Sequence, residues 1–277
     1  MIQNSAMLVE LNISTWTGRK LDKKVSQEID ENKGTRSRAG NYQKKLLAGT
    51  DKLDDLQKLV GMIRVWHYEQ TLPWADSGSR LLPMANFFDY KAKLSDFAQQ
   101  FEEAVQEFLS DYDKLVTAAA FQLGDLFDRD EYPTAEKLAG KFRFGYVFLP
   151  VPEAGDFRID VNEQYKAELQ EQYSKFYDSK LEQAMQDAWD RLHGCLERMS
   201  DKLSGDTKQI FRDTLVTNAV EMCELLTKLN VTGDSKLEAL RKKLESALVG
   251  LAAEDLRKDD DLRLDTKAKV DEILSMF

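Results

Sequence analysis

The sequence predicts a mainly α-helical protein: an elongated bundle of long antiparallel helices with a small β-hairpin or three-stranded sheet. Apolar residues recur at spacings of three and four over long stretches, and only 5 Pro and 14 Gly interrupt the 277 residues. Residues 7–16 and the two runs 141–152 and 157–161 instead show the alternation or β-rich composition of strands. We expect a mixed domain over residues 1–160 and a long-helix, coiled-coil-like bundle over residues 161–277, together one elongated unit.

Short elements of both kinds are predicted near the N-terminus. A strand is expected within residues 7–16, because apolar and polar side chains alternate there. Residues 21–29 and 41–47 are expected to form short helices, with a glycine-bounded loop between them. Regularly spaced apolar residues predict a longer helix over residues 51–68.

The middle of the chain predicts one long helix and a hairpin. The seam of apolar residues over 86–124 is typical of a helix packed along another helix. After an acidic turn, Thr134 predicts the N-cap of a short helix over residues 135–138. Two β-rich runs, 141–152 and 157–161, predict a β-hairpin, which the N-terminal strand can join as a third strand.

The second half of the sequence is nearly all helical in pattern. Apolar seams predict helices over residues 162–203, 207–229 and 235–251, with breaks at Gly-Asp and Thr-Gly-Asp-Ser sequences. A last short helix is expected over residues 266–276. Such seams usually form a protein's own core, so we expect these helices to pack on one another.

Residues 72–83 predict an exposed loop, because two prolines bound the segment and a Ser-Gly-Ser sequence lies near its centre. Large apolar side chains in an exposed loop are costly without a partner, and aromatic anchors are frequent interface hot spots. The segment is therefore a candidate protein-binding site. Its candidate residues are Trp74, Arg80, Leu81 and Leu82.

Basic residues gather in one part of an acidic chain. The formal net charge is −10, which argues against wholesale coating of nucleic acid or an anionic membrane. Residues 1–64 nevertheless carry +4, and residues 19–45 contain nine basic and four acidic residues. This segment is a candidate nucleic-acid-binding site, with a mobile surface loop as the alternative interpretation. The candidate residues are Arg19, Lys20, Lys23, Lys24, Arg36, Arg38, Lys44 and Lys45.

The sequence offers little for catalysis. It contains two His and two Cys, and it lacks the Walker A, GxGxxG and GxSxG motifs. We therefore expect no enzyme, no cofactor and no metal. We interpret the densest carboxylate cluster as a solvated turn. The alternative interpretation is a divalent-cation site. It comprises Asp125, Asp128, Asp130 and Glu131.

Two features bear on the compartment. Cys195 and Cys223 lie in helical patterns without metal-binding spacing, which fits buried thiols in a reducing environment. The sequence shows no signal-peptide pattern and no apolar stretch long enough to span a membrane. We expect a cytoplasmic protein that does not bind membranes, and a membrane-inserting hairpin is the less favoured alternative.

Three segments resemble a family of unknown function that tailed bacteriophages and some proteobacteria carry. They are residues 11–20, 68–82 and 144–161, the last including Asp156, Phe157 and Arg158. In that family, genes often lie beside those of a MoxR-type AAA+ ATPase and a von Willebrand A-domain protein. The resemblance therefore implies a phage-encoded accessory or adaptor of an ATPase-driven remodelling system in the bacterial host cytoplasm. It supplies no catalytic residues.

These observations together predict a non-enzymatic helical scaffold or adaptor. We expect it to form homo-oligomers or to bind protein partners, such as the AAA+ ATPase system that the resemblance implies. The alternative is a nucleic-acid-binding protein that uses its basic N-terminal segment.

Overall fold

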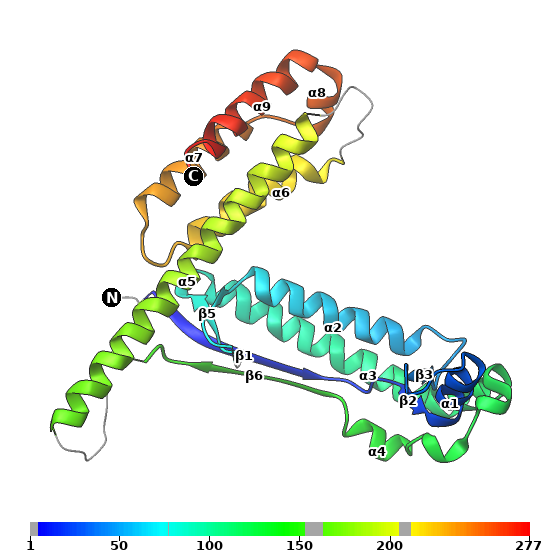
Figure 1. The fold of residues 1–277 in the computed structure, drawn as a ribbon. Coiled ribbons are helices and arrows are strands. Elements are labelled where there is room, and N and C mark those ends of the chain that lie inside the picture. The colour runs from blue at the N-terminus through cyan, green and yellow to red at the C-terminus, as the bar shows by residue number, and fades with distance from the viewer. Residues whose placement is uncertain (1–4, 77, 153–162, 205–211) are drawn as a thin grey trace. The chain divides into compact units, whose positions relative to one another are not determined.

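The computed structural model describes residues 5–76, 78–152, 163–204 and 212–277 (Figure 1). Most of these residues are helical, as predicted, and a small antiparallel sheet accompanies the helices. Among the described residues, no helix is long and apolar enough to cross a membrane.

The chain divides into two compact units, each with its own hydrophobic core. Unit 1 comprises residues 1–10, 67–90 and 147–277, and unit 2 comprises residues 11–66 and 91–146. The units do not follow the expected division at residue 160, because Ala6, Leu8 and Leu81 lie in the same core as the C-terminal helices. Residues distant in the sequence thus share a core.

Unit 2 is built on side chains of two helices, α2 (Lys52–Glu69) and α3 (Phe87–Leu123). Both helices confirm the sequence prediction, and their apolar faces share one core. The rings of Trp66 on α2 and Phe97 on α3 meet edge to face with centroids 5.1 Å apart. This core fixes the two helices as the frame of the unit.

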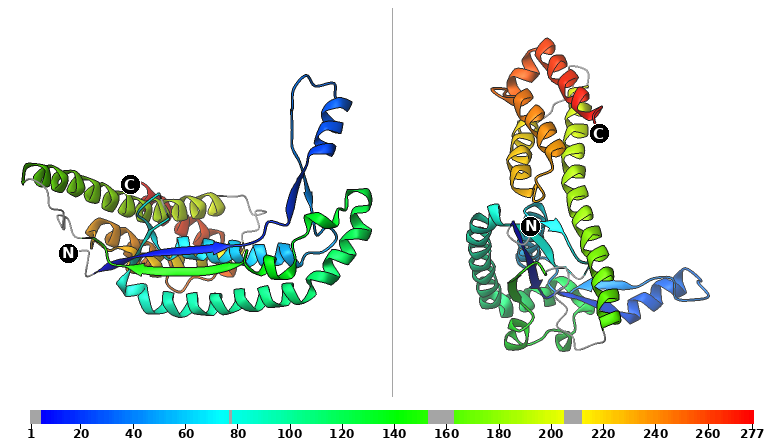
Figure 2. Two further views of the ribbon diagram at one scale, coloured as in Figure 1. Left: turned by 90° about the horizontal axis from the view of Figure 1, so that it is seen from below. Right: turned by 90° about the vertical axis from the view of Figure 1, so that its left-hand side faces the viewer.

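A basic arm, residues 19–45, projects from this frame (Figure 2). It consists of β2 (Arg19–Asp22), α1 (Lys23–Asn32) and β3 (Tyr42–Lys45), and β2 pairs antiparallel with β3. The expected helix over residues 41–47 is therefore wrong. Lys44 is buried between two exposed neighbours, which is the two-residue period of a strand.

After α3, the chain of unit 2 forms short turns. They are two 3-10 turns, η3 (Gly124–Leu126) and η4 (Arg129–Glu131), followed by α4 (Ala135–Ala139). The Thr134 side chain accepts a hydrogen bond from the Lys137 backbone N–H, so the predicted N-cap of α4 is confirmed.

A four-stranded sheet in the order β4-β5-β1-β6 corrects the loop prediction for residues 72–83. Its strands are β4 (Leu72–Pro73), β5 (Arg80–Pro83), β1 (Ala6–Ser14) and β6 (Arg143–Leu149). β4 and β5 pair antiparallel as a hairpin, and β5 also pairs with β1. The turn η2 (Met84–Asn86) then leads into α3. β6 lies beside β1, and the predicted partner strand over residues 157–161 lies outside the described residues.

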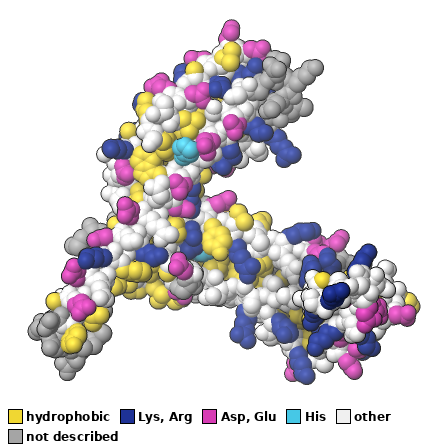
Figure 3. Space-filling view, viewed as in Figure 1, with side chains coloured by type: hydrophobic (Ala, Val, Ile, Leu, Met, Phe, Trp, Pro, Cys, Tyr) yellow, Lys and Arg dark blue, Asp and Glu magenta, His cyan; other side chains and the backbone are white. Residues whose placement is uncertain are grey.

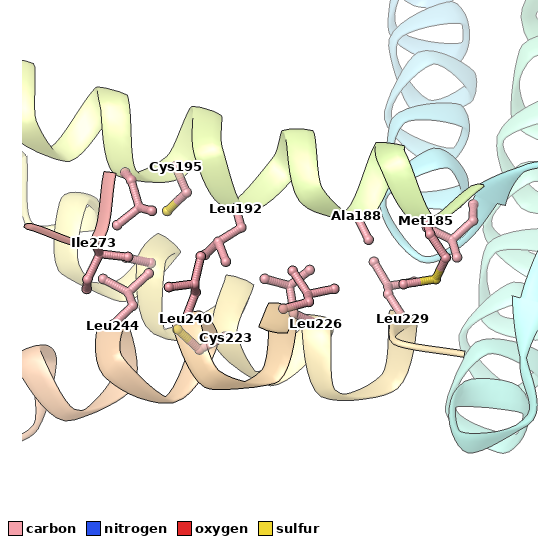
Figure 4. Close-up of a cluster of buried hydrophobic side chains, with 14 of the residues drawn as sticks. Met185, Ala188, Leu192, Cys195, Cys223, Leu226, Leu229, Leu240, Leu244 and Ile273 are labelled. Atoms are coloured by element: carbon pink, nitrogen blue, oxygen red, sulfur yellow. The ribbon is translucent and has the colours of Figure 1, made fainter. Parts of the chain in front are cut away.

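The C-terminal part of unit 1 is helical. Its helices are α5 (Glu163–Leu203), α6 (Thr214–Leu229), α7 (Ser235–Leu248), α8 (Ala253–Lys258) and α9 (Asp260–Leu274). α5, α6, α7 and α9 each contact two of the others and enclose one apolar core (Figure 4). The Asp234 side chain caps α7 by accepting hydrogen bonds from the Lys236 and Leu237 N–H groups.

The expected single elongated bundle of long antiparallel helices is not confirmed. α3 places most of its apolar side chains in the core of unit 2, whereas α5 places its own in the core of unit 1. Helical periodicity shows that a helix buries one face, but it does not show against which partner.

Candidate nucleic-acid interface

Six of the eight predicted basic residues are exposed on the arm. Figure 3 shows Lys and Arg side chains gathered over this region. None of the six forms an ion pair with any residue that the structure describes. They are Arg19, Lys20, Lys23, Lys24, Arg36 and Arg38. The exposed Lys33, which lies at the end of α1, adds a cation that sequence analysis did not single out.

Lys44 does not belong to this exposed set. Its Nζ lies 3.3 Å from an Asp22 carboxylate oxygen and 2.8 Å from a Glu131 carboxylate oxygen, and it donates a 2.8 Å hydrogen bond to the Leu126 carbonyl. Burial by itself would lower the pKa of Lys44, but the hydrogen bonds to Glu131 and Asp22 outweigh burial and raise it. Lys44 is therefore a structural cation, and its predicted role as an exposed nucleic-acid contact is wrong.

Lys45 lies at the base of the arm and also has a partner. Its Nζ lies 3.1 Å from an Asp54 carboxylate oxygen on α2, and about half of its side chain is exposed. An exposed pair of this kind is weak and exchanges readily with other anions. Lys45 can thus contribute to a basic surface, whereas Lys44 cannot.

The acidic turn after α3 also has structural roles. Glu131 is paired with Lys44, and the Asp128 side chain caps η4 by accepting a 3.0 Å hydrogen bond from the Asp130 N–H. In the part of the chain that the structure describes, no group of three or more His, Cys, Asp or Glu side chains is placed to hold a metal ion. Through Glu131, the turn anchors the arm.

Polar contacts, and few apolar ones, hold the arm together. The Asp22 side chain accepts a 3.1 Å hydrogen bond from the Val25 N–H and so caps α1. Ser26 Oγ donates to the Asp22 carbonyl at 2.6 Å and accepts from the Tyr42 N–H at 2.9 Å. Ser26 is the only buried residue of α1. The arm is thus a hydrogen-bonded module that keeps its cations in solvent.

The four predicted protein-binding residues lie in unit 1, where the structure places three of them in the core. Trp74 is 6% exposed, Leu81 and Leu82 are 0% exposed, and the Trp74 ring packs edge to face on Tyr177. Arg80 Nε donates a 2.7 Å hydrogen bond to Thr71 Oγ1. The expectation that these residues form an exposed loop is wrong, because β5 pairs with β1 and buries both of its consecutive leucines.

A second arginine in unit 1 has a role that sequence analysis missed. Arg191 on α5 donates hydrogen bonds to the carbonyls of Glu69, Tyr68 and Thr71 at 2.6, 2.9 and 2.8 Å. These carbonyls lie at the C-terminal end of α2, where cations are favoured. No local pattern in the sequence signals a contact between residues so far apart.

Comparison with known proteins adds a family to this description. The family model described as "Protein of unknown function (DUF3150)" matches residues 3–251. Comparison with curated proteins and with solved structures gives no match. Because the match spans most of the chain, the protein belongs to the DUF3150 family.

Proposed function

We propose that the protein is a non-enzymatic adaptor whose arm binds nucleic acid through its phosphates. The observation that carries this proposal is a set of six exposed cations on the arm that form no ion pair with any described residue, namely Arg19, Lys20, Lys23, Lys24, Arg36 and Arg38. Nucleic-acid affinity of this kind arises when Lys and Arg displace counterions from phosphates. A cation already held by a carboxylate contributes much less to such binding.

The pairing of the arm's strands supports the same function. Arg19 lies directly opposite Lys45, whose exposed ion pair with Asp54 is weak. Like charges at opposed positions of a two-stranded ribbon destabilise it. A polyanion bound along the ribbon would relieve this repulsion, so binding and ordering of the arm are expected to reinforce each other.

The charge distribution limits the contact to the arm. The residues after position 64 carry a net −14, which repels phosphates and leaves the arm as the favourable approach. If about six cations contact phosphates, affinity is expected to fall roughly a thousandfold between about 50 and 200 mM salt.

Fluorescence anisotropy with a labelled DNA duplex and its single strand tests the proposal. The variant Lys20→Ala/Lys24→Ala removes two cations from the arm and is expected to weaken binding about tenfold or more. Lys58→Ala/Lys114→Ala is the matched control, because these exposed lysines on α2 and α3 each pair with a neighbouring aspartate. Absence of wild-type binding to either probe at low salt would refute the proposal.

A second candidate function is that of a protein-binding scaffold. Three phenylalanine side chains are exposed on described helices, namely Phe88 (79%), Phe121 (85%) and Phe176 (51%), and exposed aromatic residues favour protein contacts. From the family resemblance we further propose that the protein is phage-encoded, that it acts in the bacterial cytoplasm and that its partner is an AAA+ ATPase. Light scattering on the purified protein and binding assays with the purified ATPase test this candidate. A strict monomer that does not bind the ATPase would contradict it.

A further inference from the structure

We infer that a cleft at the tip of the arm is a site for one phosphodiester group of the nucleic-acid backbone. This inference rests on the proposed function and assigns the contact to one place on the arm. The cleft lies between α1 and the loop that follows it and has a volume of about 370 Å³.

Three cations converge on this cleft from different parts of the arm. Lys23 comes from the first turn of α1, and Arg36 and Arg38 come from the loop after the helix. The side chains of Arg36 and Arg38 form no ion pair with a described residue. Arginine presents a planar fork of N–H donors that matches two phosphate oxygens, so a pair of arginines favours a phosphate ligand.

The two acidic residues of the cleft accept hydrogen bonds from other groups of the arm. Asp30 Oδ1 accepts a 3.2 Å hydrogen bond from the Ala39 N–H, and this contact holds the loop against α1. Glu31 Oε1 accepts a 2.7 Å hydrogen bond from Gln27 Nε2. Both carboxylates therefore shape the cleft and lower its net charge.

The net charge of the lining is suited to a phosphodiester. Three cations and two carboxylates line the cleft, which gives a net charge of +1. A phosphodiester carries one negative charge, whereas a terminal phosphate near neutral pH carries between one and two. A phosphodiester therefore neutralises the lining. Only a polymer also places neighbouring phosphates beside the other exposed cations of the arm, which favours the backbone of a polymer over a free nucleotide.

The lining also limits what else the cleft can recognise. Its remaining residues are Ser26, Gln27, Thr35 and Ser37, which are polar and not aromatic. Stacking on an aromatic ring is the usual way in which proteins hold unpaired bases. The cleft therefore binds the backbone without reading the sequence, and duplex and single-stranded DNA of the same length are both expected to bind.

Two pairs of basic residues on the same arm allow a matched test. Arg36→Ala/Arg38→Ala removes two charges from the cleft, and Arg19→Ala/Lys20→Ala removes two charges from the ribbon outside it. All four side chains are exposed, so both variants are expected to fold, which circular dichroism would check. The dissociation constant for one labelled DNA duplex is measured at the same salt concentration.

If the cleft is a site, the cleft variant loses about tenfold more affinity than the ribbon variant. The variant Arg36→Lys/Arg38→Lys keeps both charges but lacks the planar guanidinium groups. Its affinity is expected to lie between that of wild type and that of the cleft variant. Equal losses for the two alanine variants would overturn the inference and leave the proposed function standing. Failure of the wild-type protein to bind DNA would instead refute the proposed function.

A second measurement identifies the ligand directly. Amide chemical shifts of the arm are followed while a short oligonucleotide without a terminal phosphate, a mononucleotide or inorganic phosphate is added. The oligonucleotide is expected to shift the amides of Thr35, Arg36 and Arg38 at the lowest concentration. A stronger response to the mononucleotide or to inorganic phosphate would overturn the assignment to a backbone phosphodiester.

Discussion

The Nζ of Lys44 lies 2.8 Å from a carboxylate oxygen of Glu131, and this ion pair joins strand β3 of the arm to the turn η4 after α3. Asp22, which caps α1, lies 3.3 Å from the same Nζ. One buried cation therefore ties both strands of the arm to the frame of unit 2. The position of the exposed cations of the arm therefore depends on Lys44, which is itself buried.

Replacing this buried cation is expected to destabilise the base of the arm. Lys44→Met leaves the carboxylates of Asp22 and Glu131 without their cation, and removing one member of a buried pair is strongly unfavourable, here by about 2 kcal/mol or more. The expected result is faster amide hydrogen exchange in β2 and β3, together with a lower urea midpoint. Lys45→Met is the control, since its exposed pair with Asp54 contributes about 0.5 kcal/mol. Equal effects of the two substitutions would show that Lys44 is not the anchor.

Arg191 is expected to be a main determinant of the stability of unit 1. Arg191→Ala removes three hydrogen bonds to carbonyls at the end of α2, which is expected to cost about 2 kcal/mol. The Glu69 carbonyl loses its charged donor, whereas Arg80 still donates to the carbonyls of Tyr68 and Thr71. Arg198→Ala on the same helix removes an exposed arginine and is expected to change stability by less than about 0.5 kcal/mol. Urea unfolding of the two variants gives the comparison. A stable Arg191→Ala protein would show that water replaces the guanidinium at these carbonyls.

Trp74 is expected to act as a core residue. Its side chain is 6% exposed, so Trp74→Ala leaves a cavity in unit 1 and is expected to cost about 3–5 kcal/mol. Phe88→Ala, at a residue that is 79% exposed, is expected to change stability by about 0.5 kcal/mol or less. Thermal unfolding of both variants measures the difference. A Trp74→Ala protein as stable as wild type would restore the interpretation of residues 72–83 as a surface.

Much of the helical structure could be predicted from the sequence. α2, α3 and α5 each bury a continuous apolar face, and such a face imposes a spacing of three and four that can be read from a single chain. The N-caps of α4 and α7 could also be predicted, because Thr134 and Asp234 act within a few residues of their own positions.

The remaining features depend on contacts that a local pattern does not contain. β5 pairs with β1, some 70 residues away, and only this pairing turns Leu81 into the core. β3 is a strand because β2 lies beside it, although the sequence of its four residues shows no alternation of apolar and polar side chains. The exposed cations of the arm could be predicted from composition, but the burial of Lys44 depends on Glu131 in a distant turn.

His67 is expected to make unit 1 sensitive to mild acid. The side chain is buried, and its Nδ1 forms a 2.7 Å hydrogen bond with the hydroxyl of Tyr90. Burial, with a smaller contribution from the Arg80 charge, lowers the pKa of His67 from 6.5 to about 4. In the unfolded chain the imidazole keeps a pKa near 6.5. As the pH falls below this value, the unfolded state therefore binds a proton that the native state excludes.

The free energy of unfolding is thus expected to be highest above pH 6.5 and to fall by up to about 3 kcal/mol as the pH drops to 4. His67→Gln removes the titrating group, keeps a hydrogen-bonding side chain beside Tyr90 and is expected to abolish most of this loss. His193→Gln is the matched control, because the sequence contains two His and His193 is partly exposed on α5. Urea unfolding at several pH values between 4 and 7 measures the slope. If His67→Gln keeps the wild-type slope, the acid sensitivity arises from other groups.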